Sequence, residues 1–210
     1  IEQIFDEKDS NTKLKGMSME KEIETLSINN VGFQYNESGF RIENINMELK
    51  KGDFIAVIGE SGCGKSTLMK IISGLYCPTS GHITYNQSDI TLSSPENRAS
   101  IMSYVSQNIT ILDGTIHDII SFLKNDCTED EINKALQSAM LTSTINDLPE
   151  GIYTRVGESG INLSGGQLQR LALAQAIVCD KQIYLFDEIT AGLDEDTQDK
   201  LINNLRTLSH

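Results

Sequence analysis

Residues 53–74 read DFIAVIGESGCGKSTLMKIISG, and this stretch decides the fold. Its first six residues are almost all apolar, which is typical of a strand buried on both faces. Residues 59–66 then fit the pattern G-x-x-x-x-G-K-[ST], and a helical stretch follows that ends at Gly74. Glycines permit a tight turn in which successive backbone N–H groups face one concavity. The stretch therefore predicts a strand, a phosphate-binding loop (residues 59–66, called the phosphate loop below) and a helix.

The phosphate loop carries a lysine and a hydroxyl where nucleotide chemistry needs them. Lys65 is expected to place its positive charge at the β- and γ-phosphates, and the Ser66 hydroxyl is expected to ligate Mg²⁺. The positive end of the following helix adds to the attraction for phosphate. A glycine turn that contains a lysine by chance is the alternative, and the flanking strand and helix patterns argue against it. The residues expected to contact the nucleotide here are Gly59, Glu60, Ser61, Gly62, Cys63, Gly64, Lys65, Ser66 and Thr67.

A second apolar run, residues 183–186, ends in two adjacent carboxylates. Open α/β sheets bind ligands at the carboxyl ends of their strands, and neighbouring residues on a strand point in opposite directions. Asp187 and Glu188 are therefore expected to have different roles. Asp187 would reach Mg²⁺, and Glu188 would polarise the water that attacks the γ-phosphate. An acidic strand end without function would be an equal alternative if the phosphate loop were absent.

Residues 163–167 read LSGGQ and are the most specific feature of the chain. They predict a helix N-terminus with two glycines and a hydroxyl, which is a second anion-binding device. One nucleotide needs only one phosphate cradle, so a second cradle implies either two ligands or one shared ligand. An ordinary helix cap of the type Ser-x-x-Gln is the alternative.

The rest of the chain alternates strands with helices, which predicts a mostly parallel sheet flanked by helices. The first strand pattern is broken at residues 29–30, and residues 51–52 predict a turn. Thr128 and Glu131 predict a capping box at the start of a helix. Single strands are expected at residues 22–28, 31–35, 53–58 and 182–186, and a pair of strands is expected within residues 40–49. The helices are expected at residues 65–74, 167–178 and 196–208, with a helical insert over about 109–150.

The three motifs, in this order, resemble those of the nucleotide-binding domain of ATP-binding cassette (ABC) transporters, from about Glu22 to the end of the chain. In that family the phosphate loop is called Walker A, residues 183–187 are the Walker B strand, and LSGGQ is the signature. The resemblance implies an α/β fold: a P-loop NTPase (RecA-like) core with a mostly parallel sheet, an N-terminal antiparallel β subdomain, and a helical signature subdomain over about residues 109–170. It also implies ATP and Mg²⁺ as the bound cofactors.

Further residues acquire roles through the resemblance alone. Tyr35 resembles the aromatic residue that stacks on adenine, and Gln107 resembles the Q-loop glutamine. Residues 191–194 resemble the D-loop, which departs from the commoner Ser-Ala-Leu-Asp at Gly192 and keeps Asp194. The implied catalytic residues are Glu188, Lys65 and Gln107, and the implied metal ligands are Ser66, Gln107 and Asp187. The implied nucleotide contacts outside the phosphate loop are Tyr35, Thr67, Ser164, Gly165, Gly166, Gln167 and Asp194.

The resemblance implies the ATP-hydrolysing motor domain of an exporter, which dimerises head-to-tail around MgATP and drives export across a membrane. Residues 111–116 and 154–160 look like exporter segments, although Ser159 stands where a basic residue is usual. Residues 1–22 resemble a linker from an upstream membrane domain. The implied partners are a second nucleotide-binding domain, in a homodimer or a heterodimer, and the transmembrane domain of the same transporter, at the cytoplasmic face of the cell membrane.

Composition and chain organisation argue against several other classes of protein that carry the same motifs. The 210 residues include 17 Lys and Arg against 30 Asp and Glu, a net charge of −13, which argues against nucleic acid as a partner. A DNA-repair ATPase of this family carries a long coiled coil before the signature, whereas residues 67–162 show no sustained heptads. A ribosome-associated ATPase has two cassettes, and this sequence contains one. The ATPase subunit of an importer stays the nearest alternative.

The end of the sequence bears on one further residue. The resemblance implies a switch histidine at the end of a strand that follows the final helix, whereas His210 comes directly after that helix. We therefore do not assign this role to His210, and we expect the switch histidine to lie beyond this sequence. The first residue is not Met, which also favours a piece of a longer protein.

Overall fold

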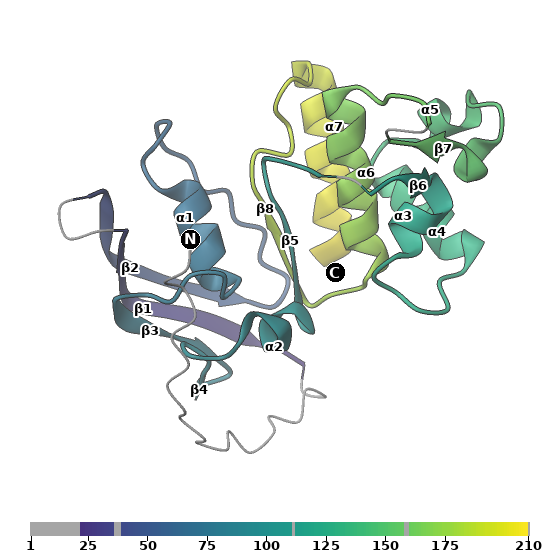
Figure 1. The fold of residues 1–210 in the computed structure, drawn as a ribbon. Helices are drawn as coiled ribbons and strands as arrows, with labels where there is room; N and C mark the ends of the chain where they lie inside the picture. The colour runs from purple at the N-terminus through teal and green to yellow at the C-terminus, as the bar shows by residue number, and fades with distance from the viewer. Residues whose placement is uncertain (1–21, 36–38, 111, 158–159, 210) are drawn as a thin grey trace.

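The computed structural model describes residues 22–35, 39–110, 112–157 and 160–209. The strands are β1 Thr25–Gln34, β2 Arg41–Lys50, β3 Ser80–Tyr85, β4 Ser88–Asp89, β5 Met102–Val105, β6 Gly114–Thr115, β7 Arg155–Val156 and β8 Ile183–Phe186. The α-helices are α1 Lys65–Ile72, α2 Pro95–Ala99, α3 Ile116–Ser121, α4 Glu129–Ser138, α5 Thr142–Asn146, α6 Gly165–Val178 and α7 Glu195–Arg206. Short 3₁₀ helices cover Gly151–Tyr153 and Thr207–Ser209. Figure 1 shows the antiparallel sheet with α1 on one side of the molecule, α3 to α7 on the other, and β5 with β8 between them.

The antiparallel sheet has the strand order β2-β1-β3-β4 and confirms the predicted N-terminal β subdomain. β1 is one strand where two separate runs are predicted, because register shifts after Ile28 absorb the asparagine pair. Asn30 has a φ of 48°, a left-handed conformation that asparagine tolerates. β2 is likewise one strand where a pair is predicted. The turn predicted at residues 51–52 is present, with Gly52 at a φ of 84°.

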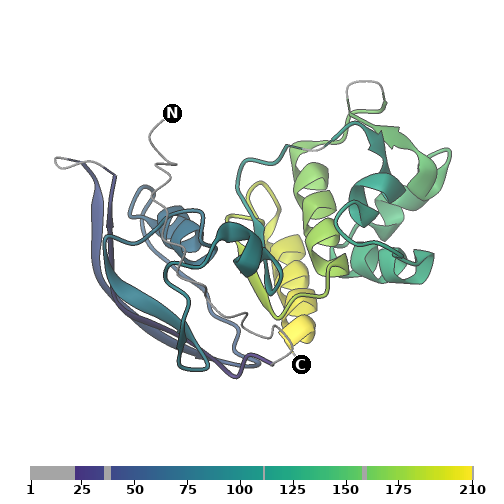
Figure 2. The same cartoon turned by 60° about the horizontal axis from the view of Figure 1, so that its bottom comes forward.

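Helix α1 packs on the concave side of this sheet (Figure 2). Its face toward the strands is apolar, and Leu68, Ile71 and Ile72 are buried there. Met102 of β5 and Leu185 of β8 belong to the same hydrophobic core, which we call the sheet core. Its buried members are Leu26, Ile28, Val31, Leu68, Ile71, Ile72, Ile83, Tyr85, Ile90, Met102 and Leu185.

A second hydrophobic core, which we call the helical core, lies among α3, α4, α6 and α7. Val105, at the end of β5, belongs to this core, whereas Met102 of the same strand belongs to the sheet core. The β5–β8 pair is therefore the boundary between the two cores. The largest fully buried members of the helical core include Ile116, Ile120, Ile132, Leu136, Leu141, Ile145, Leu171 and Leu173.

The parallel sheet is smaller than the sequence predicts. β5 and β8 are parallel, with Met102 opposite Ile183, and within the described ranges this sheet contains only these two strands. The strand predicted over residues 53–58 is wrong for this structure: the segment pairs with no strand, and Ile58 is 92% exposed. The reason is that an apolar run becomes a strand only where a neighbouring backbone takes up its N–H and C=O groups. Here β5 occupies one edge of β8, and no described segment connects β8 to residues 53–58.

The helices begin close to the predicted positions because their caps are readable from sequence. At α4, Thr128 N donates to Glu131 Oε2 at 2.8 Å, and Glu131 N donates to Thr128 Oγ1 at 3.3 Å, which confirms the capping box. α6 starts at Gly165, two residues before the predicted start, because Ser164 is its N-cap. α7 is capped by Asp194 and is followed by a 3₁₀ helix where the prediction extends the α-helix to residue 208.

Two further points on the fold concern membrane-spanning helices and the residues outside the described ranges. None of the helices in the described ranges is both long and apolar enough to cross a lipid bilayer. The linker predicted over residues 1–22 lies outside the described residues except for Glu22, and Ser159 and His210 lie outside them as well.

Arg98 of α2 is a fully buried charge, with 1% of its surface exposed. Its guanidinium donates to the carbonyl oxygens of Ile71 and Ile72 at the end of α1, at 2.7 and 2.8 Å. It also donates to the carbonyl oxygens of Ile90 and Thr91, at 2.8 Å each. Cations are favoured at helix C-termini, where the last carbonyls have no partner in the helix. Arg98 therefore fixes the far end of α1 to the segment that leads into β5.

Arg98→Lys is expected to lower the free energy of unfolding by about 1–3 kcal/mol, because one ammonium cannot serve both carbonyl pairs. The carbonyls of Ile71 and Ile90 keep backbone donors, whereas that of Ile72 or that of Thr91 would lose its donor. Urea denaturation measures the change. Arg41→Lys is the matched control, since Arg41 is exposed and pairs with Glu43 at 3.3 Å. That control is expected to change stability by less than about 0.5 kcal/mol. Equal losses in the two variants would contradict the role given to Arg98.

Candidate functional site

The phosphate loop folds around the ammonium group of its own lysine. Lys65 Nζ donates to the carbonyl oxygens of Gly59 and Glu60, at 2.9 Å each. Gly62 and Gly64 have φ values of 81° and 106°, left-handed conformations that glycine adopts at little cost. The loop therefore has the tight turn that its glycines predict, with a positive charge held inside it.

Helix α1 begins directly after the loop. Its first N–H groups have no partner within the helix, and its N-cap, Gly64, offers no side chain to them. The partial positive charge of a helix N-terminus attracts anions. Lys65 and Ser66 are half-buried on the first turn of α1, next to the exposed residues Glu60 and Ser61. The loop, the ammonium and the helix start together suit phosphate oxygens.

Tyr35 lies directly after β1 and is tied to α1. Its hydroxyl is 3.0 Å from Oγ1 of Thr67. Its ring meets those of Phe33 and Tyr76 at nearly a right angle, with centroid distances of 5.0 and 5.7 Å, and 46% of the residue is exposed. The residue that the resemblance assigns to adenine is therefore fixed beside the helix that begins at Lys65.

Asp187 and Glu188 directly follow β8 and have different surroundings, although neither residue lies on the strand. Asp187 is 5% exposed, and its Oδ2 accepts a hydrogen bond from the Tyr104 hydroxyl at 3.3 Å. Burial, together with this carboxylate, raises the pKa of Tyr104 to about 12, so the hydroxyl is a donor at neutral pH. Glu188 is exposed, and its φ of 55° is uncommon for a residue other than glycine.

Gln107 follows β5 and meets Glu188 after β8. Its Nε2 donates to Glu188 Oε2 at 2.5 Å. Because β5 and β8 are parallel neighbours, their carboxyl ends lie at the same edge of the sheet. The structure thus brings Gln107, Asp187 and Glu188 together at this edge.

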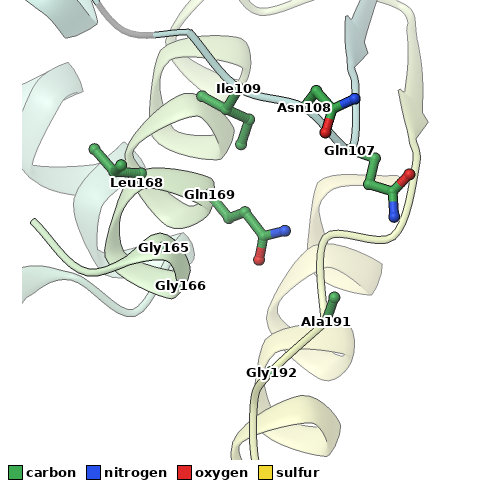
Figure 3. Close-up of a pocket in the computed structure, with 9 residues that line it drawn as sticks. All are labelled: Gln107, Asn108, Ile109, Gly165, Gly166, Leu168, Gln169, Ala191 and Gly192. Atoms are coloured by element: carbon green, nitrogen blue, oxygen red, sulfur yellow. The ribbon is translucent and has the colours of Figure 1, made fainter.

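A cavity of about 440 Å³ separates the start of α6 from the segments that follow β5 and β8 (Figure 3). The LSGGQ residues reach it through the first turn of α6. Ser164 Oγ accepts the N–H of Gln167 at 3.3 Å, and Gln167 Oε1 accepts the N–H of Ser164 at 2.8 Å, so the ordinary helix cap is present. The space around the Cα of Gly165 is open. The lining residues are Gln107, Asn108, Ile109, Gly165, Gly166, Leu168, Gln169, Ala191 and Gly192.

The D-loop borders the same cavity. Leu193 Cδ2 lies 3.6 Å from the place of a Cβ on Gly166, so the D-loop and the LSGGQ motif touch within one chain. Gly192 has a φ of 78°, which explains why glycine suits this position. Asp194 Oδ1 accepts the N–H of Thr197 at 3.0 Å, and hydrogen bonding with the side chain and then the backbone of Thr197 lowers the pKa of Asp194. The carboxylate that the resemblance assigns to the nucleotide therefore caps α7 in this structure.

The predicted site residues form separate groups. Within the described ranges, no hydrogen bond or ion pair joins residues 59–66 to Asp187 or Glu188. The cause is the unpaired segment 53–58, because the phosphate loop is not held on the sheet that carries the two carboxylates.

Sequence reasoning missed two residues that support the site, Tyr104 and Arg98. Tyr104 is three residues before Gln107, but its contact with Asp187 depends on the pairing of β5 with β8. Arg98 is a charge in a polar segment, and only its burial reveals its role. Neither contact has a signal in the sequence, because each depends on how distant segments of the chain meet.

Comparison with known proteins identifies the family. The family model described as ABC transporter matches residues 42–191. The ABC-type transporter kk1G of Curvularia clavata is 38% identical over 174 residues, covering 82% of this chain and 13% of that protein. A multidrug resistance ABC transporter ATP-binding and permease protein of Lactococcus lactis subsp. lactis (strain IL1403) is 36% identical over 195 residues, covering 92% and 33%. A solved structure, a bacterial Atm1-family ABC exporter with ATP bound, matches with a TM-score of 0.80 and 30% identity over 90% of this chain and 33% of that chain.

The chain spans between 13% and 33% of the length of these relatives. The structural match confirms the predicted P-loop NTPase fold with its antiparallel N-terminal sheet. The matched residues 42–191 contain the phosphate loop, the LSGGQ motif and residues 183–187, and they make up more than half of the chain. The chain therefore belongs to the ABC transporter family.

Proposed function

We propose that this chain binds and hydrolyses ATP as the motor of an ABC exporter. The observation that carries the proposal is the contact between Gln107 and Glu188 beside the buried Asp187. Phosphoryl transfer to water needs a metal ligand and a carboxylate that takes the proton of the attacking water. Asp187 offers the first and Glu188 the second, and Gln107 holds Glu188 in place. The family membership, and relatives named as multidrug transporters, support the same function.

Ser66, Gln107 and Asp187 are proposed to hold Mg²⁺, because their side chains supply the oxygen atoms that this ion prefers, Gln107 and Asp187 at the ends of β5 and β8 and Ser66 on α1. Mg²⁺ prefers oxygen ligands and is usually held by one or two carboxylates together with phosphate oxygens. Asp187 is buried, and no lysine, arginine or histidine in the described part of the chain forms an ion pair with it, so a cation would balance its charge. Bound there, Mg²⁺ would neutralise charge on the β- and γ-phosphates.

Glu188 is the proposed base. Its carboxylate is exposed and can take a proton from water, whereas the buried Asp187 cannot meet water as freely. The side-chain amide of Gln107 has two kinds of polar atom. Its nitrogen holds Glu188, and its oxygen is left to reach the metal ion. Gln107 therefore joins the metal site to the base.

Lys65 and the phosphate loop are proposed to bind the phosphates. Lys65 Nζ would exchange its bonds with the carbonyls of Gly59 and Glu60 for bonds with β- and γ-phosphate oxygens. These charge-assisted bonds are the stronger kind. Tyr35 would stack on the adenine, since its ring is half exposed beside α1.

The LSGGQ motif is proposed to act on a second copy of the cassette. α1 belongs to the sheet core and α6 to the helical core, so one chain presents its two anion-binding helix starts at different places. A head-to-tail dimer places the start of α6 of one copy over the phosphate loop of the other. Ser164, Gly165, Gly166, Gln167 and the D-loop Asp194 would then close on a shared ATP, and hydrolysis would reopen the dimer.

The remaining parts of the proposal concern the whole transporter. The partner would be a second nucleotide-binding domain, identical or related, together with the transmembrane part of the same transporter. The chain would work at the cytoplasmic face of the membrane. Residues 1–22 would link it to the membrane part, residues 23–210 would form the nucleotide-binding domain, and residues about 109–170 would form its helical subdomain. The name of a relative as an ATP-binding and permease protein supports this arrangement.

Phosphate release from MgATP tests the proposal. The rate per chain is expected to rise with protein concentration until the dimer is saturated, and to vanish when EDTA removes Mg²⁺. A mixture of Lys65→Ala chains with Gly165→Asp chains is expected to regain activity that each lacks alone, because mixed dimers contain one intact shared site. A chain that neither binds nor hydrolyses ATP would overturn the function. A mixture that stays inactive would overturn the head-to-tail site.

A further inference from the structure

Phe40 is an aromatic side chain that the proposed function does not use. It lies just before β2, is 43% exposed, and belongs to neither hydrophobic core. Exposing part of a phenyl ring to water is unfavourable unless something covers it. Phe40 lies next to the phosphate loop, so a ligand bound at that loop could cover its ring.

Phe40 contacts the loop at the residue before Lys65. A Cβ placed on Gly64 would lie 2.9 Å from Cζ and 3.3 Å from Cε1 of the Phe40 ring. Gly64 is therefore glycine because of its φ of 106° and because Ile42 Cγ2, at 2.7 Å, and this ring both approach the place of a Cβ. Because Gly64 is the N-cap of α1, the Phe40 ring lies at the start of this helix.

Phe40 also faces Tyr35. The two ring centroids are 6.5 Å apart with a tilt of 48°, and the backbone N–H of Tyr35 donates to the carbonyl of Phe40 at 3.4 Å. The Tyr35 ring also contacts the rings of Phe33 and Tyr76, and its hydroxyl is 3.0 Å from Thr67 Oγ1. Aromatic groups interact best at centroid distances of about 4.5–7 Å, in stacked or edge-to-face geometry. A flat base that stacks on Tyr35 would thus also meet the ring of Phe40.

We infer that Phe40 is a second aromatic contact of the bound nucleobase, opposite or beside Tyr35. The inference rests on the proposed function, because it assumes that the phosphate loop holds a nucleotide. A phenyl ring offers a π-face and no hydrogen bond, so it supports any purine. The Tyr35 hydroxyl is already engaged with Thr67 and adds no base-specific bond. Phe40 therefore contributes affinity for the base without selecting adenine over guanine.

Equilibrium titration of the full chain with MgATP, MgGTP and magnesium tripolyphosphate separates the base from the phosphates. Phe40→Ala is expected to weaken MgATP and MgGTP binding by about 5- to 100-fold, the usual worth of one stacked base, and to leave tripolyphosphate binding unchanged within about twofold. Phe40→Tyr keeps the aromatic ring and is expected to bind all three ligands as the parent does. Phe40→Leu keeps an apolar contact with Gly64 and is expected to lose affinity for the two nucleotides only. Leu92→Ala, at an 81% exposed position in the β4–α2 connection, is the control and should change nothing.

The outcomes are distinct. Equal losses for tripolyphosphate and ATP in Phe40→Ala would mean that the ring only supports the phosphate loop, and would overturn the inference. Unchanged binding of every ligand would overturn it as well. A parent chain that binds neither ATP nor tripolyphosphate would instead contradict the proposed function.

Discussion

Glu188→Gln is expected to bind MgATP as the parent chain does and to release phosphate about 10²–10⁴ times more slowly, which is the usual contribution of a general base. The amide cannot accept a proton from the attacking water. Its carbonyl oxygen can still accept the hydrogen bond that Gln107 Nε2 gives to Glu188. The left-handed backbone at this position is as uncommon for glutamine as for glutamate, so the exchange leaves the local strain unchanged. The variant therefore removes the proton acceptor and keeps the geometry.

Phosphate release at saturating ATP gives the rate, and size-exclusion chromatography with ATP gives the oligomeric state. The variant is expected to elute as a dimer, because the shared ligand stabilises the closed state and is no longer consumed. Glu48→Gln, on an exposed position of β2, removes the same charge elsewhere and is expected to keep the parent rate. Hydrolysis by Glu188→Gln at the parent rate would contradict the role of Glu188 as the base.

Features that depend on a few consecutive residues could be predicted from the sequence. The turn of the phosphate loop follows from glycines at positions 62 and 64, because the required φ values are accessible to them. The starts of α4 and α6 follow from Thr128 and Ser164, whose side chains bind N–H groups three residues later. Both kinds of feature are decided by local backbone geometry.

Features that depend on pairing between distant segments could not be predicted in the same way. The apolar run 53–58 has the composition of a buried strand, yet its state depends on whether another strand lies beside it. The continuity of β1 past Asn30 likewise depends on β2, which accommodates the register shift. In both cases the composition of the segment is compatible with a strand, and the adjacent strand determines whether and how the strand forms.

The same distinction, between features of consecutive residues and contacts of distant ones, applies to the candidate site. The identities of Lys65, Asp187 and Glu188 could be read from the sequence because their motifs are contiguous. The contacts of Tyr104 with Asp187 and of Phe40 with Gly64 could not, because each joins residues more than 20 positions apart. Such contacts need the register of strands and the approach of a loop, which a single sequence does not specify.

Lys65→Ala is expected to lower the affinity for MgATP by about 10- to 150-fold, since a hydrogen bond to a charged group contributes about 1.5–3 kcal/mol. Among the residues that the structure describes, its ammonium contacts only the carbonyls of Gly59 and Glu60 and, at 4.0 Å, the Cys63 Sγ atom. Gly59 and Glu60 are exposed, so water can replace the lysine at their carbonyls. The loss is therefore expected in ligand binding and hardly at all in stability, and thermal denaturation checks the second point.

Comparing MgATP with magnesium tripolyphosphate, as for Phe40, tests whether Lys65 acts on the phosphates. Lys65→Ala is expected to weaken binding of MgATP and magnesium tripolyphosphate by the same factor, because the ammonium acts on phosphate oxygens that both ligands share. Lys134→Ala is the matched control: it removes an exposed lysine that pairs with Asp130 on α4, and it is expected to leave both affinities unchanged. Unchanged ATP affinity in Lys65→Ala would contradict the assignment of residues 59–66 as the phosphate loop. A loss confined to ATP would place Lys65 at the nucleoside and not at the phosphates, because tripolyphosphate has no other group for the ammonium to meet.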